Sequence, residues 1–422
     1  MDKLVINGPT KLKGEVTVSS AKNASLPIMA ATILFPGKMN FSNLPGLSDI
    51  NFFLQILESL GASVTKNTDS ITVNSKTIST TKADYELVRK MRASVLVLGP
   101  LLARFGEAKV SLPGGCAIGT RPVDIHLKGL EALGAKIEIS EGYINAKCER
   151  LQGNTIHLAF PSVGATENIM MAACLAEGDS TIENSACEPE IEDLENFLNA
   201  CGFKVQGAGT PTIKISGKNI EDLQADKIVD HKIIGDRIEA ATYIIAGLMT
   251  DSEITVKGFN PSHIGAVITV LKEMGAKLEV GDNEVKVYPS GKLSGAKIET
   301  GPHPGFPTDV QAQLMSLMGV SSGYSIVSEK IFENRFMHVP ELVRLGMKID
   351  LDGNYAFIQG TDKLSPAPVM CTDLRASAAL VLSALLVDGE TTVNRIYHLD
   401  RGYEKIEHKL QSLGADIKRV KE

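Results

Sequence analysis

The sequence predicts an α/β protein of two domains, each built from three similar units of the form helix, strand, helix, strand, strand. Three observations lead to this prediction: a glycine that recurs after an amphipathic helix, an apolar helix that precedes each such helix, and a length of 422 residues. Single hydrophobic cores stop growing near ~250–300 residues. A chain of this length therefore favours two compact domains.

The recurring glycines end six amphipathic helices, and each helix runs on into a strand. They are Gly61, Gly134, Gly202, Gly275, Gly346 and Gly414. Apolar residues recur at helical spacing before each one, and glycine is the usual left-handed residue just past the last helical turn. A period of about 70 residues that persists through the chain indicates an internal structural repeat.

A second, more apolar helix precedes each amphipathic helix. These helices contain the segments SLPIMAATIL, SVLVLGPLLARF, IMMAACLA, IEAATYIIAGLM, AQLMSLMGV and ASAALVLSALLV. Helices that are apolar on all sides are typical of a buried core. A strand is expected between the two helices of a unit, and a strand with an alternating hairpin is expected after the glycine.

The two ends of the chain are expected to complete one domain together. The sixth unit stops at GADIKRVKE without a closing hairpin, whereas LVINGPTKLKGEVTVSS near the N-terminus has the hairpin pattern. We expect one domain over residues 21–229 and a second over 1–20 plus 230–422, with the active site in the cleft between them. An open solenoid is the alternative, but it needs no such exchange and usually has shorter repeats.

The composition excludes several classes of function. With 43 basic and 50 acidic residues the net charge is −7, so we expect no nucleic acid partner and no membrane partner. We find no apolar run long enough to span a bilayer and no signal-peptide profile at the start, so we expect a cytoplasmic location. The six cysteines show neither disulfide nor metal spacing and are expected to be reduced.

Polar side chains gather where the helices are expected to begin. At the core helices they are Lys22, Asn23, Arg92, Glu167, Asn168, Asp236, Arg237, Asp309, Asp373 and Arg375, and at the second helices Cys116, Arg121, Asp124, Glu333, Arg335, Asp400 and Arg401. Helix N-termini favour anions, and guanidinium groups bind phosphate and carboxylate through two hydrogen bonds. The pattern predicts a basic pocket for such groups. For any single arginine, a surface salt bridge is the alternative interpretation.

Cys116 and Asp309 have the most distinctive surroundings. Cys116 lies in the Gly-rich segment LPGGCAIGTRP, beside a cation and a helix start, which predicts a mobile lid and a reactive thiol. Cys148, Cys174, Cys187 and Cys201 are expected to be inert core thiols, and Cys371 is left open. Asp309 begins a helix, where a carboxylate is most often an N-cap. Metal-ligand spacing, a Walker loop and a GxGxxG motif are absent, so we expect no cofactor and no metal.

The chain resembles the UDP-N-acetylglucosamine 1-carboxyvinyltransferases, or UDP-GlcNAc enolpyruvyl transferases, of the EPSP synthase superfamily. The resemblance covers essentially the whole chain and rests on SSAKNASLPIMAATIL, MRAS, LPGGCAIGTRPVDIHLKGLEALGA, PSVGATENIMMAA, PGFPTDVQAQ, ENRFMHV, TDLRASAALV and LDRGYE. It implies an inside-out α/β barrel fold. It also implies transfer of an enolpyruvyl group from phosphoenolpyruvate to the 3′-hydroxyl of UDP-N-acetylglucosamine, the first committed step of peptidoglycan synthesis.

The same resemblance implies roles for individual residues. Cys116 is implied as the proton donor that also forms a covalent adduct with phosphoenolpyruvate, Asp309 as the candidate base, and Lys22, Arg401 and Asp373 as further catalytic residues. Phosphoenolpyruvate is implied to contact Lys22, Asn23, Arg121, Arg375 and Arg401. UDP-N-acetylglucosamine is implied to contact Arg92, Arg121, Pro122, Val123, Asp124, Ile125, Ser162, Val163, Gly164, Asp309 and Ile331. Arg335 is expected in the same anion pocket, and the chain is expected to be a monomer or a weak homo-oligomer.

Two alternatives stay open at this point. The first is an EPSP-type synthase that uses shikimate 3-phosphate, which the loop GGCAIGTRPVD argues against because the sister enzyme does not resemble the chain there. The second is an inactive anion-binding or regulatory paralogue. The retained Lys22, Cys116, Asp309, Asp373, Arg375 and Arg401 argue against it.

Overall fold

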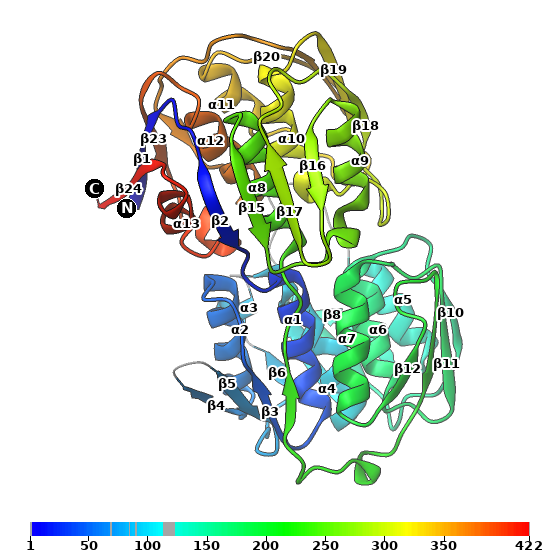
Figure 1. Ribbon diagram of the computed structural model, residues 1–422. Coiled ribbons are helices and arrows are strands. Elements are labelled where there is room, and N and C mark those ends of the chain that lie inside the picture. The colour runs from blue at the N-terminus through cyan, green and yellow to red at the C-terminus, as the bar shows by residue number, and fades with distance from the viewer. Residues whose placement is uncertain (1, 68–69, 84, 89–90, 113–122, 422) are drawn as a thin grey trace. The chain divides into compact units, whose positions relative to one another are not determined.

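The computed structural model describes residues 2–67, 70–83, 85–88, 91–112 and 123–421, and Figure 1 shows its helices and strands. The described residues divide into two compact units. The terminal unit contains both ends of the chain, the residues up to Ser19 and those from Gly235 onward. The central unit contains the described residues between Ser20 and Ile234.

The central unit has three helix pairs and three four-stranded sheets. Its core helices are α1 (Lys22–Ala31) with the 3-10 turn η1 (Thr32–Leu34), η2 (Arg92–Val97) with α4 (Leu98–Phe105), and α6 (Val163–Ala173). Its outer helices are α2 (Ser48–Ser59), α5 (Asp124–Ala132) and α7 (Pro189–Ala200), with the short α3 (Tyr85–Val88) and η3 (Ile220–Asp222). The first sheet contains, in spatial order, β14 (Val229–His231), β3 (Lys38–Phe41), β5 (Ile71–Asn74) and β4 (Ser63–Lys66). The second contains β6 (Lys82–Ala83), β7 (Glu107–Ser111), β9 (Tyr143–Lys147) and β8 (Lys136–Ser140). The third contains β10 (Thr155–His157), β11 (Asp179–Glu183), β13 (Thr212–Ser216) and β12 (Lys204–Gln206).

The terminal unit repeats this plan. Its core helices are α8 (Arg237–Met249), α10 (Thr308–Val320) and α12 (Leu374–Ala384), and its outer helices are α9 (Gly265–Glu273), α11 (Val339–Arg344) and α13 (Ile406–Ser412), with the turns η4 (Pro261–Ile264) and η5 (Leu399–Arg401). The first sheet contains, in spatial order, β2 (Lys13–Thr17), β15 (Glu253–Lys257), β17 (Glu284–Tyr288) and β16 (Lys277–Val280). The second contains β18 (Lys297–Glu299), β19 (Tyr324–Ser328), β21 (Tyr355–Gln359) and β20 (Lys348–Asp352). The third contains β22 (Val369–Met370), β23 (Gly389–Asn394), β1 (Asp2–Gly8) and β24 (Asp416–Lys421). The α/β fold of repeated units predicted from the sequence is confirmed.

Each sheet takes one edge strand from a neighbouring repeat, and this exchange closes each unit into a ring. In the central unit, β14 at the end of the third repeat pairs in parallel with β3 of the first, which sets Val229 opposite Met39. In the terminal unit, β2 pairs in parallel with β15, which sets Val16 opposite Val256. An open solenoid would leave these strands without partners, so the closed arrangement is the correct one.

The predicted N-terminal hairpin is wrong, because β1 and β2 belong to different sheets. β1 is antiparallel to both β23 and β24, and Figure 1 shows the blue β1 beside the red β24. It thereby fills the strand position that the sixth repeat lacks, and Leu4 and Ile6 are fully buried. β2 then becomes the exchanged edge strand of another sheet.

Helix burial and helix ends agree with the sequence pattern. All 13 residues of the core helix α8 are buried, whereas the outer helix α9 buries Val267, Ile268 and Leu271. The six repeat glycines have φ between 94° and 104°, the left-handed region that residues with a Cβ avoid. The predicted glycine caps are confirmed.

Replacing Ile6 by Ala is expected to lower the free energy of unfolding by about 2–5 kcal/mol, because the side chain is fully buried in the sheet that joins the two chain ends. Urea denaturation followed by circular dichroism measures the change. Lys13→Ala, an exposed position on β2, is the control and should change the value by less than about 0.5 kcal/mol. Equal losses in the two variants would contradict a packing role for β1.

Candidate active site

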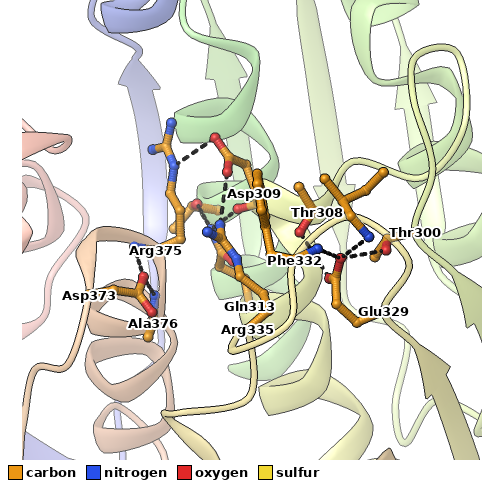
Figure 2. A network of polar contacts seen from close by, with 12 residues as sticks. Thr300, Thr308, Asp309, Gln313, Glu329, Phe332, Arg335, Asp373, Arg375 and Ala376 are labelled. Carbon is orange, nitrogen blue, oxygen red and sulfur yellow. Dashed lines mark hydrogen bonds and ion pairs between the residues drawn. The ribbon is translucent and has the colours of Figure 1, made fainter. Parts of the chain in front are cut away.

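In the terminal unit the carboxylate of Asp309, near the start of α10, lies between two arginines. Its Oδ1 accepts a hydrogen bond from Nη2 of Arg335 at 2.8 Å, and its Oδ2 accepts one from Nε of Arg375 at 3.3 Å (Figure 2). The arginine side chains are 4% and 2% exposed, and that of Asp309 is 27% exposed. The two buried cations share this one carboxylate, and Asp236 also lies close enough to Arg375 to raise the pKa of its guanidinium.

Arg375 retains its charge although it is buried. Burial acts to lower the pKa of its guanidinium, but the neighbouring Tyr403 and Asp309 outweigh burial and raise the pKa above its ordinary value. Its Nη1 is buried and has no hydrogen-bond partner among the described residues. A buried donor without an acceptor is unfavourable by ~1–3 kcal/mol, and more for a charged group. The geometry therefore suits an anionic ligand at Nη1.

The interpretation of Asp309 as a helix cap is wrong. The N-cap of α10 is Pro307, and the carboxylate of Asp309 bonds the two guanidinium groups instead. Asp373, in contrast, caps a helix, as Asp236 does at the start of α8. It precedes α12, and its Oδ1 accepts from the backbone N–H groups of Arg375 at 2.8 Å and Ala376 at 3.0 Å.

Glu329, which the sequence reasoning missed, fixes the segment that carries Ile331 and Arg335. Its buried carboxylate accepts hydrogen bonds at 2.8–3.1 Å from Thr300 Oγ1, Thr308 Oγ1, Ile331 N and Phe332 N, most of which Figure 2 shows. Ile331 itself is partly buried. A carboxylate that accepts several bonds at once is rigid. The sequence feature that could have indicated Glu329 is its place as an acidic residue directly after the strand segment YSIVS.

Arg401 is partly exposed at the end of η5, next to a strong ion pair. The carboxylate of its neighbour Asp400 accepts two hydrogen bonds from Arg419 of β24, at 3.0 and 2.6 Å. Arg419 also donates to Glu407 of α13 at 2.7 Å. The pairing fixes η5 against the last strand and helix, and therefore the position of Arg401.

His338 is a fully buried group that the sequence did not indicate. Its pKa is lowered to about 4, mainly by burial, with Asp373 acting in the opposite direction and Arg335 in the same direction. The imidazole is therefore neutral at neutral pH.

In the central unit, Lys22 is the first residue of α1 and is 8% exposed. Its Nζ lies 3.7 Å from Oδ2 of Asp49, which is 1% exposed near the start of α2. Asn23 follows on α1 and is partly buried. The sequence reasoning missed Asp49. A buried ion pair of this kind fixes the ammonium group, because separation would leave a charge unpaired.

The predicted sugar-site residues of this unit lie at two helix starts. Ser162 is the N-cap of α6 and accepts from Ala165 N at 3.4 Å, and Val163 and Gly164 open the helix. Asp124 opens α5 and is exposed, and Val123 and Ile125 pack against the core.

A buried hydrogen bond joins α5 and α6. Asn168 of α6 lies 3.1 Å from Nδ1 of His126 of α5. Its neighbour Glu167 is fully buried, and burial, then Glu190 and Glu188, raise the pKa of this carboxyl well above its usual range. Glu167 therefore favours the neutral form.

Several predicted residues fall outside the described residues. They are Cys116, Arg121 and Pro122, together with the side chain of Arg92, whose backbone begins η2. Their roles stay predictions. Among the other cysteines, burial raises the pKa of Cys201 and of Cys371 to about 12, so these thiols are poor nucleophiles at neutral pH.

The described residues contain no group of three or more His, Cys, Asp or Glu side chains placed to hold a metal ion. Within the same ranges, no helix has both the length and the apolar character needed to cross a bilayer.

The chain is similar in sequence to known enzymes. The family model described as EPSP synthase (3-phosphoshikimate 1-carboxyvinyltransferase) matches residues 6–410. The UDP-N-acetylglucosamine 1-carboxyvinyltransferase of Geotalea uraniireducens is 53% identical over 422 residues, and 100% of each chain is covered. UDP-N-acetylglucosamine 1-carboxyvinyltransferase 2 of Carboxydothermus hydrogenoformans is 52% identical, also with 100% of each chain covered.

Solved structures share the fold. The enolpyruvyl transferase NikO of Streptomyces tendae superposes with a TM-score of 0.89 at 25% identity, with 99% of each chain covered. An EPSP synthase of Acinetobacter baumannii superposes with a TM-score of 0.76 at 17% identity, with 100% of each chain covered. The second likeness concerns the fold alone.

Replacing Asp373 by Ala is expected to lower the free energy of unfolding by about 1 kcal/mol, because two backbone N–H groups at the start of α12 lose their acceptor. Asp373→Asn should lose only a few tenths of a kcal/mol, since Asn also caps helices well. Urea denaturation of the two variants provides the comparison. An equal loss in both would show that the charge, rather than the cap, is what stabilises the helix start.

The buried His338 is expected to make stability depend on pH between about pH 4 and pH 6.5. The unfolded chain binds a proton there that the folded chain does not, so the free energy of unfolding falls as the pH is lowered through this range. Between pH 7 and pH 5 the contribution of His338 is about 2 kcal/mol.

The measurement is urea denaturation at both pH values for the unmodified chain and for His338→Gln, which should lack this part of the decrease. His408→Gln, an exposed histidine of α13, is the matched control and should retain it. The same decrease in all three proteins would refute the contribution assigned to His338.

Proposed function

We propose that this chain, which belongs to the UDP-N-acetylglucosamine 1-carboxyvinyltransferase family, transfers the enolpyruvyl group of phosphoenolpyruvate to the 3′-hydroxyl of UDP-N-acetylglucosamine and releases phosphate. The structural observation that carries the proposal is the buried cluster of Arg335, Asp309 and Arg375, which has two guanidinium groups, one carboxylate and a guanidinium nitrogen without a hydrogen-bond partner among the described residues. The product would enter peptidoglycan synthesis at its first committed step.

Phosphoenolpyruvate has the two anionic groups that such a cluster favours, a phosphate and a carboxylate. In the proposal Arg375 and Arg401 of the terminal unit bind it, with Lys22, Asn23 and Arg121 of the central unit, and Arg335 contributes positive charge. Arg375 suits this role because its Nη1 needs an acceptor and a carboxylate or phosphate oxygen supplies one. Lys22 suits it because Asp49 fixes its ammonium group at the start of α1.

The UDP-sugar is proposed to lie along two helix starts of the central unit. Its diphosphate suits the N-terminal end of α6 at Ser162, Val163 and Gly164, where the helix dipole favours negative charge. Arg92, Arg121, Pro122, Val123, Asp124 and Ile125 are the proposed uridine-side contacts, and Asp309 and Ile331 are the proposed contacts from the terminal unit.

The chemistry needs an acid before it needs a base. Protonation of C3 of phosphoenolpyruvate makes C2 electrophilic, and Cys116 is the proposed proton donor and the site of the covalent adduct. The sugar hydroxyl then adds to C2, and loss of phosphate and of a proton from C3 restores the double bond. Lys22, Arg121 and Arg401 are proposed to stabilise the charge on the departing phosphate.

Asp309 is the candidate base for the hydroxyl proton. Its two arginine partners favour the ionised carboxylate, which makes it a weak base while both bonds persist. A proton acceptor of this kind becomes stronger if a bond to one arginine lengthens or if water is excluded. Asp373 is proposed to act by holding the start of α12, and with it Arg375.

Three further points stay predictions: binding of the substrates between the two units, a cytoplasmic location, and a monomer or weak homo-oligomer. The same holds for the expectation that no cofactor or metal takes part.

Phosphate release from phosphoenolpyruvate is expected when UDP-N-acetylglucosamine is the acceptor and not when shikimate 3-phosphate is the acceptor. A coupled phosphate assay on the purified chain measures both. Cys116→Ser is the control variant and should fold normally but release phosphate at least about 100-fold more slowly, since it lacks the proposed proton donor. A folded sample that is silent with UDP-N-acetylglucosamine, or active with shikimate 3-phosphate, would overturn the proposal.

A further inference from the structure

A buried polar network beside Arg375 joins the core helices α8 and α10 to the segment that follows η5 in the terminal unit. It consists of Thr242 of α8, Gln313 of α10 and Tyr403, which are 0%, 0% and 1% exposed. The hydroxyl of Tyr403 lies 2.9 Å from Thr242 Oγ1 and 3.0 Å from Gln313 Nε2. Gln313 Nε2 also lies 3.0 Å from the backbone carbonyl oxygen of Asp309.

Thr242 Oγ1 has three neighbours in this network: the carbonyl of Ile238, the hydroxyl of Tyr403 and, at 3.2 Å, Nε2 of Gln313. Thr242 Oγ1 donates its single proton to the carbonyl of Ile238 at 2.8 Å, so towards Tyr403 it acts as an acceptor. The Tyr403 hydroxyl therefore donates to Thr242 and accepts from the amide of Gln313. Burial raises the pKa of this phenol, which keeps the donated proton in place at neutral pH.

The ring of Tyr403 contacts the guanidinium of Arg375. The guanidinium carbon lies 5.4 Å from the ring centroid, within the range of a cation–π interaction. On another side, Nε of Arg375 bonds Asp309 at 3.3 Å. The aromatic ring and the carboxylate together hold the guanidinium in one orientation.

Tyr403 is also coupled to Arg401 through the backbone. It follows η5 by two residues, and its N–H donates to the carbonyl of Leu399 at 3.0 Å. A ring whose hydroxyl is bonded on both sides has little freedom to move. The turn that carries Arg401 is therefore attached to the same network that contacts Arg375.

We infer that Tyr403 is a positioning residue for the phosphoenolpyruvate site: through its hydroxyl and ring it orients Arg375 and Arg401 without touching either substrate. The inference rests on the proposed function in one respect, because that function identifies the anion as phosphoenolpyruvate. Its structural part, the dependence of the Arg375 orientation on the Tyr403 hydroxyl, is independent of the reaction.

Tyr403→Phe is the direct test, since it removes the hydroxyl and keeps the ring. The KM for phosphoenolpyruvate is expected to rise about tenfold, with the KM for UDP-N-acetylglucosamine within twofold of the unmodified value, because loss of a buried hydrogen bond is worth ~1 kcal/mol or more. Both values come from steady-state phosphate release with the other substrate saturating. An equal rise in both KM values, or no rise, would overturn the inference.

Tyr243→Phe is the matched control. Tyr243 is the residue after Thr242 on α8 and is 0% exposed, but its hydroxyl has no hydrogen-bond partner among the described residues. The same chemical change at the same burial should leave both KM values unaltered. A tenfold rise here as well would mean that the effect is general loosening of the core, and would reject a specific role for Tyr403.

Thr242→Val is the second variant, in case Tyr403→Phe does not fold. It removes the acceptor of the Tyr403 proton and should produce the same selective rise in KM for phosphoenolpyruvate. Crystal structures of the variants give a readout without turnover: Nε of Arg375 should move away from Asp309. An unchanged contact in a variant that folds would overturn the inference, whereas an unmodified chain without turnover would count against the proposed function alone.

Discussion

The exchange of edge strands between repeats is the constraint on which the rest of the structure depends. A single repeat has a sheet whose edge strand belongs to its neighbour, so no repeat completes its hydrogen bonds alone. The pairings of β14 with β3 and of β2 with β15 close each set of three repeats. Within the terminal unit, closure brings the starts of α10 and α12 together, and Asp309 and Arg375 meet there.

The electrostatic balance where Asp309 and Arg375 meet follows from the burial of the charged side chains there. Arg335 and Arg375 are almost fully buried, and a buried cation without a partner is strongly unfavourable. Asp309 compensates for one of the two charges, and Tyr403 offers its ring to the guanidinium of Arg375. Asp236 also stabilises the charge of Arg375, and the proposed anionic substrate would add to this compensation.

Much of this could be predicted from sequence where the signal is local. The glycine caps and the all-apolar core helices depend on neighbouring residues, whereas the partners of β1 and β2 lie hundreds of positions away and no local pattern identifies them.

Two Thr-Asp pairs show the limit of predicting helix starts from sequence. In FPTDVQ the helix begins at Thr308, so Asp309 lies inside it and reaches the arginines; in CTDLRAS it begins at Leu374, so Asp373 is the cap. A shift of two residues in the helix start separates the two roles. Glu329, Asp49 and Tyr403 gave no signal strong enough to mark them as part of the site.

The position of β1 has a consequence for how the protein is made. This strand leaves the ribosome before the whole central unit, whereas both of its partners, β23 and β24, are synthesised after that unit. The sequence of the central unit is continuous and emerges in between, so its strands find all their partners while translation is still under way. The terminal unit cannot complete its sheets until β24 has been synthesised. The second ring, and with it the full arginine cluster, is therefore completed only after the central unit.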